Sequence, residues 1–470
     1  MKYFTDPEGV ITLDNLVMTI MLMGVLFLLS GVLRKCVPIL RNLGIPSSII
    51  AGVFGLLLGP SLCEIIPLNM DVLKLIVYHG LALVFISIGL QRPPKTASTP
   101  DAMSMGFAIG AMAALQGLVG MLLTVILGFM SGSLIHPGFG LLLPLGFNQG
   151  PGQALTFGAA WEPSVLANGT LGAGLVDGAD VGLIIAALGF AWSIFVGIPL
   201  VAYGRKKGWL KSSSSTTVIA EENETEIKSE PGSLDTLTTH IATIAIIYLG
   251  VYLALDILSS VLEEKQKIVD MLWGFHFLFG LAFALITRKF LTRPLGIPLQ
   301  NRQLGQLSNL VVDLVTCAAL AAIQVSVLKN NLVPILVITM AGGLVTVVTV
   351  VLLASRSFEQ SRFQHAVLWF GASTGTLPMG LALLRMIDPE LKSPAPTNMT
   401  VGSIFAIIFS APLLAIMPYP ISQWPHGFPQ AAWITIALLA VYFVVIVGLW
   451  RVFGKLRFTG KGIWKKEKNV

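Results

Sequence analysis

Charged residues are scarce in this sequence. Asp, Glu, Lys and Arg make up 11% of its 470 residues, whereas 54% of the residues are hydrophobic and the mean hydropathy is +0.81. A soluble domain typically contains about 25% charged residues, so this composition excludes an ordinary soluble domain. It predicts an all-α polytopic membrane protein, in which each crossing helix needs about 20 apolar residues.

Cysteines and grouped histidines are scarce as well. Cys36, Cys63 and Cys317 are far apart, and the six histidines are dispersed without an HxxxH or HExxH pattern. We therefore expect neither a disulfide framework nor a metal cluster. Paired acids on one helix are also missing, so we expect no enzyme and no cofactor. The net charge of +6 comes without a nucleic-acid-binding signature, and no nucleic-acid partner is expected.

Long apolar segments lie on both sides of a polar linker. The linker, residues 205–236, is rich in Ser and charged residues and is expected to be disordered. Six apolar segments precede it, near residues 13–33, 47–66, 72–90, 103–131, 139–168 and 174–204. Seven follow, near residues 237–260, 268–290, 306–328, 332–354, 364–388, 398–418 and 430–453.

The distribution of Lys and Arg predicts which segments cross the membrane. If all thirteen segments crossed, basic residues would scatter over both sides. If the segments near 139–168 and 364–388 enter and leave on the same face, 25 of the 30 basic residues lie on one side. The other five are Lys2, Lys74, Lys265, Lys267 and Lys329. This predicts a multi-pass protein of the cell inner (plasma) membrane, with the N-terminus outside and the linker and C-terminus in the cytoplasm.

The same arrangement makes the two halves of the chain inverted repeats. Residues 1–204 and 237–418 would each supply five membrane helices and one re-entrant broken hairpin. Residues 419–470 would add an extra C-terminal helix and a basic tail. Inverted repeats whose broken elements meet near the middle of the membrane are typical of secondary transporters.

Both broken segments contain several Gly, Pro and polar residues between stretches that are apolar enough to cross a membrane. The first reads GFNQGPGQALTFGAA from Gly146, and the second reads FGASTGTLPMG from Phe370. Irregular backbone persists at membrane depth only where it is buried in protein or lines a wet cavity. Free helix N-termini attract anions, whereas carbonyl and side-chain oxygens suit a hard cation. We therefore expect a substrate site at Asn148, Gln149, Gly150, Gly152, Gln153, Thr156, Ser373, Thr374, Gly375 and Thr376. Close helix packing alone would explain the glycines but not the polar residues beside them.

Few charges are placed to assist this site. No Lys or Arg occurs from Thr96 to Gly204, and Arg385 is either a topological anchor or a partner for a carboxylate. Asp256 and Asp313 lie inside apolar segments, where a carboxylate is a functional candidate. Asp313 shares a helix face with Asn309 and with Gln324, three turns farther on; a structural hydrogen bond is the alternative role. The candidate cation ligands are Asn309, Asp313, Gln149 and Thr374.

Several stretches resemble the bacterial sodium/glutamate symporter family. They are LGIPSSIIAGVFGLLLG (43–59), ISIGLQ (86–91), GxGxxxTFGAAW (150–161) and HAVLWFGASTGTLPMGLALL (365–384). The resemblance covers the first twelve segments and implies sodium-driven glutamate uptake by a homodimer with an elevator mechanism. Residue by residue, the resemblance extends to Gly150, Gly152, Thr156, Gly158, Trp161, Gly371, Gly375 and Pro378. The chain departs from the family at its first tip, FNQGPGQ, where a Ser/Gly/His-type tip is expected, and by its thirteenth helix.

These observations lead to one main hypothesis and three alternatives. The main hypothesis is a membrane-embedded symporter that couples sodium to glutamate or a related small carboxylate. On the same scaffold, a carrier coupled to protons or another cation could move a different organic anion. A channel is the third possibility, and an intramembrane enzyme the fourth.

Overall fold

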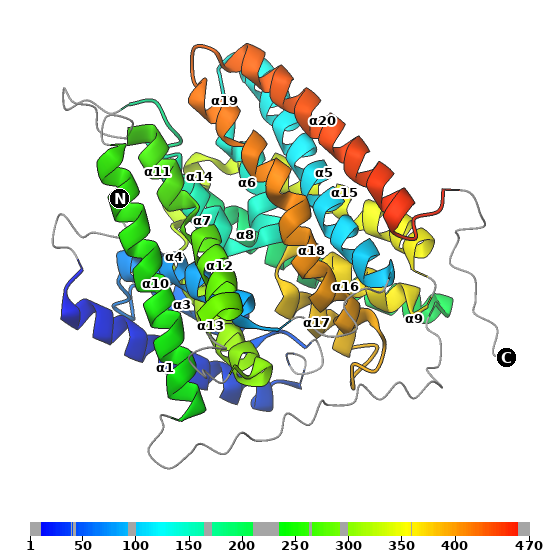
Figure 1. Ribbon diagram of the computed structural model, residues 1–470, viewed down its shortest axis with the longest axis horizontal. Coiled ribbons are helices and arrows are strands. Elements are labelled where there is room, and N and C mark those ends of the chain that lie inside the picture. The colour runs from blue at the N-terminus through cyan, green and yellow to red at the C-terminus, as the bar shows by residue number, and fades with distance from the viewer. Residues whose placement is uncertain are drawn as a thin grey trace.

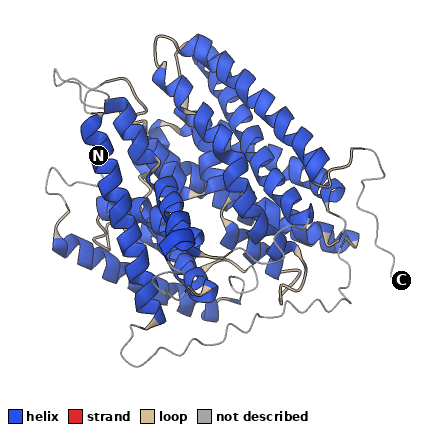
Figure 2. Ribbon diagram, in the orientation of Figure 1, coloured by secondary structure: helices blue, strands red, loops and turns tan. Residues whose placement is uncertain are grey.

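The computed structural model describes residues 11–38, 40, 44–92, 100–163, 172–209, 235–262, 266–291, 299–358 and 360–458. This part of the chain forms helices and no strands (Figure 2). The core of the predicted linker, residues 210–234, lies outside the described residues, as does the end of the basic tail. The expectation of disorder in the linker therefore stays a prediction.

The helices follow one another along the chain as the sequence predicts. Those before the linker are α1 (Leu13–Cys36), α3 (Ser47–Leu58), α4 (Met70–Leu90), α5 (Pro100–Ser131), α6 (Gly138–Pro144), the π-helical turn η1 (Leu145–Gln149), α7 (Pro151–Ala160), α8 (Gly178–Phe195) and α9 (Gly197–Lys207). Those after it are α10 (Thr236–Val261), α11 (Gln266–Gly274), α12 (His276–Ile286), η2 (Thr287–Leu291), α13 (Asn301–Ala321), α14 (Val325–Asn330), α15 (Leu332–Ser357), α16 (Arg362–Thr374), α17 (Leu377–Arg385), α18 (Ala395–Ile416), α19 (Pro418–Ser422) and α20 (Phe428–Phe453).

The chain is a multi-pass membrane protein. Within the described residues, nine helices are long and apolar enough to cross a membrane, with α8–α9 and α18–α19 each counted as one. The pair α11–α12 would be a tenth span, but it is bent by 57°. The extra helix predicted near residues 430–453 is among the nine, as α20.

Two of the expected crossing helices differ from their predicted form. The segment near 47–66 gives only the 12-residue α3, about 18 Å long at 1.5 Å per residue. Gly59 and Pro60 end it early, because proline has no N–H to continue the hydrogen-bond ladder. The segment near 268–290 is not one straight helix but bends at Phe275.

Several helices begin at residues that cap them. The side chain of Asn69 accepts a hydrogen bond from Val72 N at 3.0 Å, and that of Asp235 accepts one from Thr238 N at 2.8 Å. Such caps satisfy N–H groups that have no partner within the helix. The hydrogen bonds from Thr238 also lower the pKa of the exposed Asp235 carboxyl, because they favour its charged form.

The helices form two groups (Figure 1). In the first, which we call the α4–α13 group, α3 and α12 pack on α13 and α4, with α1 and α10 outside them. In the second, the α5–α18 group, α18, α20 and α15 pack on α5. The elements α6, α7 and α8 lie between the groups: α6 packs on α5 and α15, α7 packs on α4 and α13, and α8 contacts both α13 and α15.

Paired glycines bring the central elements to backbone contact. A β-carbon added to Gly120 on α5 would lie 2.1 Å from the carbonyl oxygen of Gly140 on α6. One added to Gly158 on α7 would lie 2.1 Å from the carbonyl oxygen of Gly178, which begins α8. Membrane helices use small residues in this way to approach closely. The α6–α7 segment is thus joined tightly to the helices before and after it.

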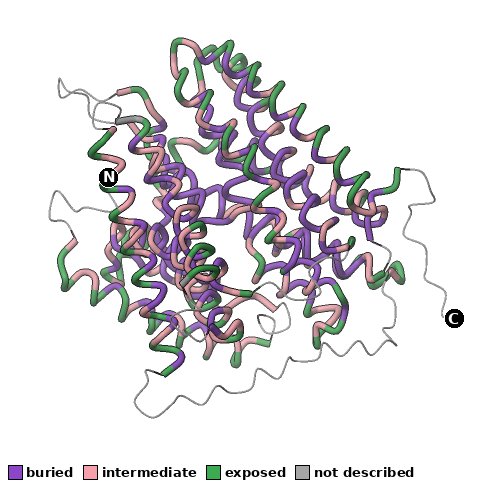
Figure 3. The backbone as a smooth tube through the Cα atoms, in the orientation of Figure 1, coloured by how far each residue is buried: buried purple, intermediate pink, exposed green. Residues whose placement is uncertain are grey.

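The distribution of buried residues matches this arrangement of helices. Buried residues gather in the middle of the molecule, and exposed residues lie along the outer helices (Figure 3). Only 22% of the apolar window of α1 is buried, and 28% of those of α10 and α20. Their exposed surfaces carry large apolar side chains such as Leu28, Ile246 and Val444, as expected of helices that face lipid tails.

The close approach of Gly158 to Gly178 makes a stability prediction. Gly158→Ala should destabilise the protein by about 1–3 kcal/mol, because its methyl group overlaps the Gly178 backbone. Gly448→Ala in α20, where a β-carbon meets nothing within 4 Å, is the matched control and should leave stability equal or slightly higher. Thermal unfolding in detergent measures both. Equal midpoints for the two variants would mean that α7 and α8 do not pack backbone against backbone.

Candidate functional site

The first broken element owes its shape to its prolines and glycines. Pro144, which ends α6, lacks the N–H that a continuous helix would use there. The chain makes one π-helical turn and then reaches Gly150, with φ +93° and ψ 176°. An L side chain rarely adopts this conformation. Pro151 then starts α7, at a helix position that suits proline.

The α6–α7 element folds back on itself. A β-carbon on Gly138, at the start of α6, would lie 3.2 Å from the ring of Trp161, just after α7. Gly138 N donates a hydrogen bond to Nδ1 of His136 at 3.0 Å. Burial lowers the pKa of His136 to about 3, so its imidazole is neutral and can accept this hydrogen bond. Both ends of the element therefore lie together, and the first tip (residues 148–153) lies away from them.

The second broken element is also a hairpin. The second tip (residues 373–376) joins the end of α16 to α17, which has a proline in its first turn. A β-carbon on Gly371 of α16 would lie 2.6 Å from the Cα of Gly380 on α17. The two short helices are therefore in backbone contact close to the tip.

The two tips meet. A β-carbon on Gly150 would lie 3.2 Å from Cγ2 of Thr376 and 3.9 Å from the carbonyl oxygen of Gly375. The helix α8 passes beside the second tip, where a β-carbon on Gly189 would lie 2.3 Å from the carbonyl oxygen of Thr374. Residues from the two halves of the chain, more than 220 positions apart, are thus brought together by their irregular backbone.

Polar side chains from neighbouring helices hold the second tip. Gln116 on α5 donates through Nε2 to Oγ1 of Thr346 at 2.8 Å and to the carbonyl oxygen of Ser373 at 3.0 Å. The hydroxyls of Ser193 on α8 and Thr374 are 2.7 Å apart. At the first tip, Asn148 donates to the carbonyl oxygen of Ile109 at 2.9 Å, and Gln153 donates to Oε1 of Gln149 at 3.2 Å.

Buried oxygens without a hydrogen-bond partner lie in the same part of the molecule. They are Gln116 Oε1, Gln153 Oε1, Thr156 Oγ1 and Ser373 Oγ, on residues that are at most 3% exposed. A buried polar atom left unpaired costs about 1–3 kcal/mol. Oxygen atoms of this kind suit a cation or a ligand that donates hydrogen bonds.

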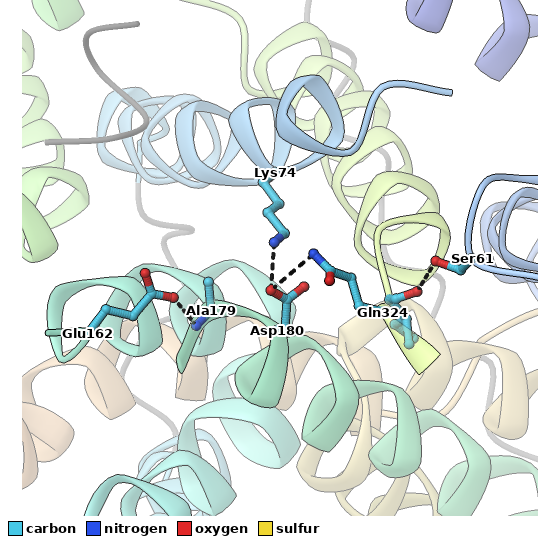
Figure 4. Close-up of polar contacts among 7 residues, drawn as sticks. Ser61, Lys74, Glu162, Ala179, Asp180 and Gln324 are labelled. Atoms are coloured by element: carbon cyan, nitrogen blue, oxygen red, sulfur yellow. Dashed lines mark hydrogen bonds and ion pairs between the residues drawn. The ribbon is translucent and has the colours of Figure 1, made fainter. Parts of the chain in front are cut away.

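A buried ion pair lies farther along α7 and α8. Lys74 Nζ on α4 is 2.6 Å from Asp180 Oδ2 on α8, and the two side chains are 5% and 6% exposed (Figure 4). Gln324 Nε2 is 3.4 Å from the same oxygen. One residue before Asp180, the N–H of Ala179 donates to Glu162 at 3.0 Å. This pair was not predicted from the sequence, where its signal is an acid in the first turn of a strongly apolar helix.

The predicted substrate residues lie together, but the predicted cation ligands do not. The tip residues expected from the sequence are buried or half-buried around the meeting point, with Gly152 packed on Leu81 of α4. On α13, Asn309 is exposed and Asp313 is half-buried. Within the described residues, no hydrogen bond or ion pair joins either of them to the tips. Asp256 and Arg385 are exposed.

The second tip also contains a pattern found in hydrolases. Residues 371–375 read GASTG and match GxSxG, the pattern around the nucleophile of many hydrolases. That pattern exposes a serine only at a strand-to-helix turn. Here Ser373 is fully buried in the last turn of α16, and Ser373 Oγ hydrogen-bonds to no described side chain. The geometry is that of a helix end rather than a nucleophile.

Known proteins offer no direct guide to this site. Comparison of the chain with models of protein families, with curated proteins and with solved structures finds no match. The structure itself shows an all-helical, multi-pass membrane protein. Two of its broken helical elements meet in a buried polar centre.

The hydrogen bonds of Gln116 make a prediction about this centre. Gln116→Met keeps the length of the side chain but leaves the Ser373 carbonyl oxygen without its donor, so it should destabilise the protein by about 1 kcal/mol, less than the loss of two hydrogen bonds because the unpaired Gln116 Oε1 is removed as well. Gln423→Met, at an exposed position, is the control and should change little. Thermal unfolding in detergent measures both variants. A Gln116→Met protein as stable as the control would show that Gln116 does not hold the second tip.

Proposed function

We propose that this protein is a sodium-coupled secondary transporter of glutamate or a related small carboxylate, with its substrate site between the two tips. The observation that carries the proposal is the contact of Gly150 with Thr376. Broken helices from the two halves of a chain that meet inside a membrane protein are how secondary transporters build their sites.

The packing of the α4–α13 group supports inverted repeats. If the halves correspond, α3 matches α12 and α4 matches α13. Gly52 and Gly55 of α3 pack on α13 against Leu320 and Ala321. In the same way, Gly280 of α12 packs on α4 against Ile86. The α3–α13 and α12–α4 contacts are then one contact repeated, and the α4–α13 contact lies on the axis that relates the halves.

The ends of the short helices supply opposite electrostatic environments. The N-termini of α7 and α17 both begin at the tips, and free N–H groups at helix N-termini favour a carboxylate. The C-terminus of α16 lies at the second tip, beside the unpaired oxygens Gln116 Oε1 and Ser373 Oγ. Exposed carbonyls at a helix C-terminus favour a cation. A sodium ion and a carboxylate bound side by side would each strengthen the binding of the other.

The resemblance to the sodium/glutamate symporter family supports the choice of ion and substrate. It falls on the elements that meet, including Gly150, Gly158, Gly371 and Gly375. The proposed orientation places the N-terminus outside and the linker and basic tail in the cytoplasm, with both hairpins re-entering the membrane from opposite faces. A homodimer is the assembly that the resemblance implies.

Cysteine labelling tests the first hairpin. Gly132 and Asp177 flank it and are exposed, so single cysteines at these positions should react with a membrane-impermeant maleimide from the same, outer side. The native Cys36 and Cys63, both exposed, are built-in controls for the inner and outer faces; each is tested alone, with the other cysteines replaced. Labelling of Gly132→Cys and Asp177→Cys from different sides would exclude a re-entrant hairpin and the site built on it.

Uptake into proteoliposomes tests the transport activity. An inward sodium gradient should drive accumulation of labelled glutamate, and choline in place of sodium should abolish it. The Asn148→Ala/Thr374→Ala double variant should reduce uptake at least ~10-fold, because removing a hydrogen-bonding side chain from a buried site costs about 1 kcal/mol or more. Exposed Gln423→Ala is the control.

Other outcomes would select the alternatives. Uptake that continues in choline under a proton gradient would identify a proton-coupled carrier. Flux that does not saturate and carries current freely would identify a channel. Unchanged sodium-dependent uptake by the double variant would place the substrate site elsewhere.

A further inference from the structure

Three arginines lie where helices of the α4–α13 group end, on the side that the distribution of charge predicts to be cytoplasmic. Arg92 follows α4, Arg288 lies in η2 at the end of α12, and Arg302 lies in the first turn of α13. Because α4 and α13 are among the helices able to span a membrane, these arginines are placed at the level where lipid headgroups begin.

Hydrogen bonds fix the junction of these helix ends. The side chain of Asn301 accepts a hydrogen bond from Arg92 N at 2.8 Å and donates one to the carbonyl oxygen of Arg92 at 2.9 Å. Nη1 of Arg288 donates to the carbonyl oxygen of Gln91. The ends of α4, η2 and α13 are therefore joined through the backbone of two consecutive residues.

An apolar cluster beside the arginines packs the same helices together. Leu90 of α4, Ala284 of α12 and Leu304 of α13 are all fully buried members of this cluster. A β-carbon on Gly89 of α4 would lie only 2.7 Å from the β-carbon of Ala284. Each arginine lies about one helical turn or less along the chain from one of these buried residues, so all three belong to one end of the packed helices.

The charges at this end have the same sign. Arg92 is close enough to Arg288 to repel it electrostatically. The N-terminus of α13, which has no side-chain cap, adds the positive end of a helix dipole. A cation such as Arg302 in the first turn of a helix is unfavourable for the same reason. Gathering like charges costs free energy, which a bound anion would offset.

The described acids do not pair with the two exposed arginines. Arg92 and Arg302 are exposed, and within the described residues no ion pair joins either of them to an acid. Asp235 begins α10 on the same predicted side, but both of its oxygens accept hydrogen bonds from Thr238. That carboxylate therefore serves as the cap of its own helix.

Exposed apolar side chains lie next to the arginines in sequence. Ile286 and Phe290, on either side of Arg288, are 53% and 59% exposed, and Leu310 of α13 is 57% exposed. Apolar surface of this kind faces lipid tails in a membrane protein. A ligand with an anionic head and apolar tails would contact both kinds of surface, whereas a free anion would use the arginines alone.

We propose that Arg92, Arg302 and Arg288 bind the phosphate group of an anionic phospholipid in the cytoplasmic leaflet. Arg92 and Arg302 supply exposed guanidinium groups, whose planar shape suits paired hydrogen bonds to phosphate oxygens. Arg288 adds positive charge beside them. The site lies away from the tips and does not depend on the transported solute. It makes the packing of α4, α12 and α13 sensitive to the charge of the surrounding lipid.

Stability in the presence of added lipid tests the proposal. Thermal unfolding in detergent is followed at constant ionic strength while dioctanoyl phosphatidylglycerol, a short-chain anionic phospholipid, is added. The midpoint of the wild type should rise, because a ligand that binds the folded state stabilises it. In Arg92→Gln/Arg302→Gln, half-maximal stabilisation should need at least ~10-fold more of this lipid, since each arginine near a lipid headgroup contributes to binding.

Two further variants are the controls. Arg205→Gln/Lys206→Gln removes two exposed charges from the end of α9, on the same predicted side, and should respond as the wild type does. Arg92→Lys/Arg302→Lys keeps both charges and should respond more strongly than the glutamine variant. The hydrogen bonds of Asn301 go to the backbone of Arg92, so they survive all of these substitutions.

Several outcomes would overturn the proposal. One is a wild type that the anionic lipid does not stabilise, or that dioctanoyl phosphatidylcholine stabilises equally. Another is an equal response of the Arg92→Gln/Arg302→Gln and Arg205→Gln/Lys206→Gln variants. Equal stabilisation by inorganic phosphate at the same concentration would overturn the assignment to a lipid, because the site would then be a general anion site. If the double glutamine variant does not fold, Arg92→Gln and Arg302→Gln are titrated singly, and a wild-type response from both would likewise overturn the proposal.

Discussion

The backbone N–H and C=O groups at the two tips impose the central constraint on this structure. Each helix end leaves groups without a partner inside the helix, and the lipid interior offers none. The tips therefore have to be enclosed by protein. Gly150 and Thr376 enclose each other, α8 covers the second tip at Gly189, and Gln116 donates to the carbonyl oxygen of Ser373.

Some polar atoms near the tips still have no hydrogen-bond partner, although protein encloses them. The atoms without a partner are unevenly distributed. The unpaired atoms around the tips and on α7 are oxygens of Gln116, Ser373, Gln153 and Thr156, whereas helix N-termini supply the free N–H groups. The acceptors lie on α5, α7 and α16, whereas the donors lie at the N-termini of α7 and α17, so α7 carries both kinds. A pair of ligands with opposite charges would complete both sets, which is the physical basis for coupling an ion to a carboxylate.

The sequence predicts local features of this arrangement better than distant ones. Pro144, Gly150 and Pro151 break a helix wherever it lies, so both tips could be located from residue types alone. The early end of α3 was also signalled, by Gly59 and Pro60, although the apolar run beyond them obscured it. The pairing of Lys74 with Asp180 depends on how helices 106 residues apart pack, and no local pattern carries that information.

The candidate cation ligands on α13 show a second limit. Helical spacing correctly places Asn309 and Asp313 on neighbouring turns. It does not show whether that face of the helix points into the protein or toward its surface. In the structure Asn309 is exposed and Asp313 half-buried. Gln116 is a contrasting case, because one amide in the apolar α5 was a visible signal whose partners, Thr346 and the backbone of Ser373, required the fold.

The glycine contacts on either side of the first tip have a mechanical consequence. Gly120 fixes α6 to α5, and Gly158 fixes α7 to α8, both at distances that leave no room for even a methyl group. The first tip therefore cannot swing open as a separate flap. Whatever gives a solute access to it must move α6 together with α5 and α7 together with α8, or move the second tip away from Gly150.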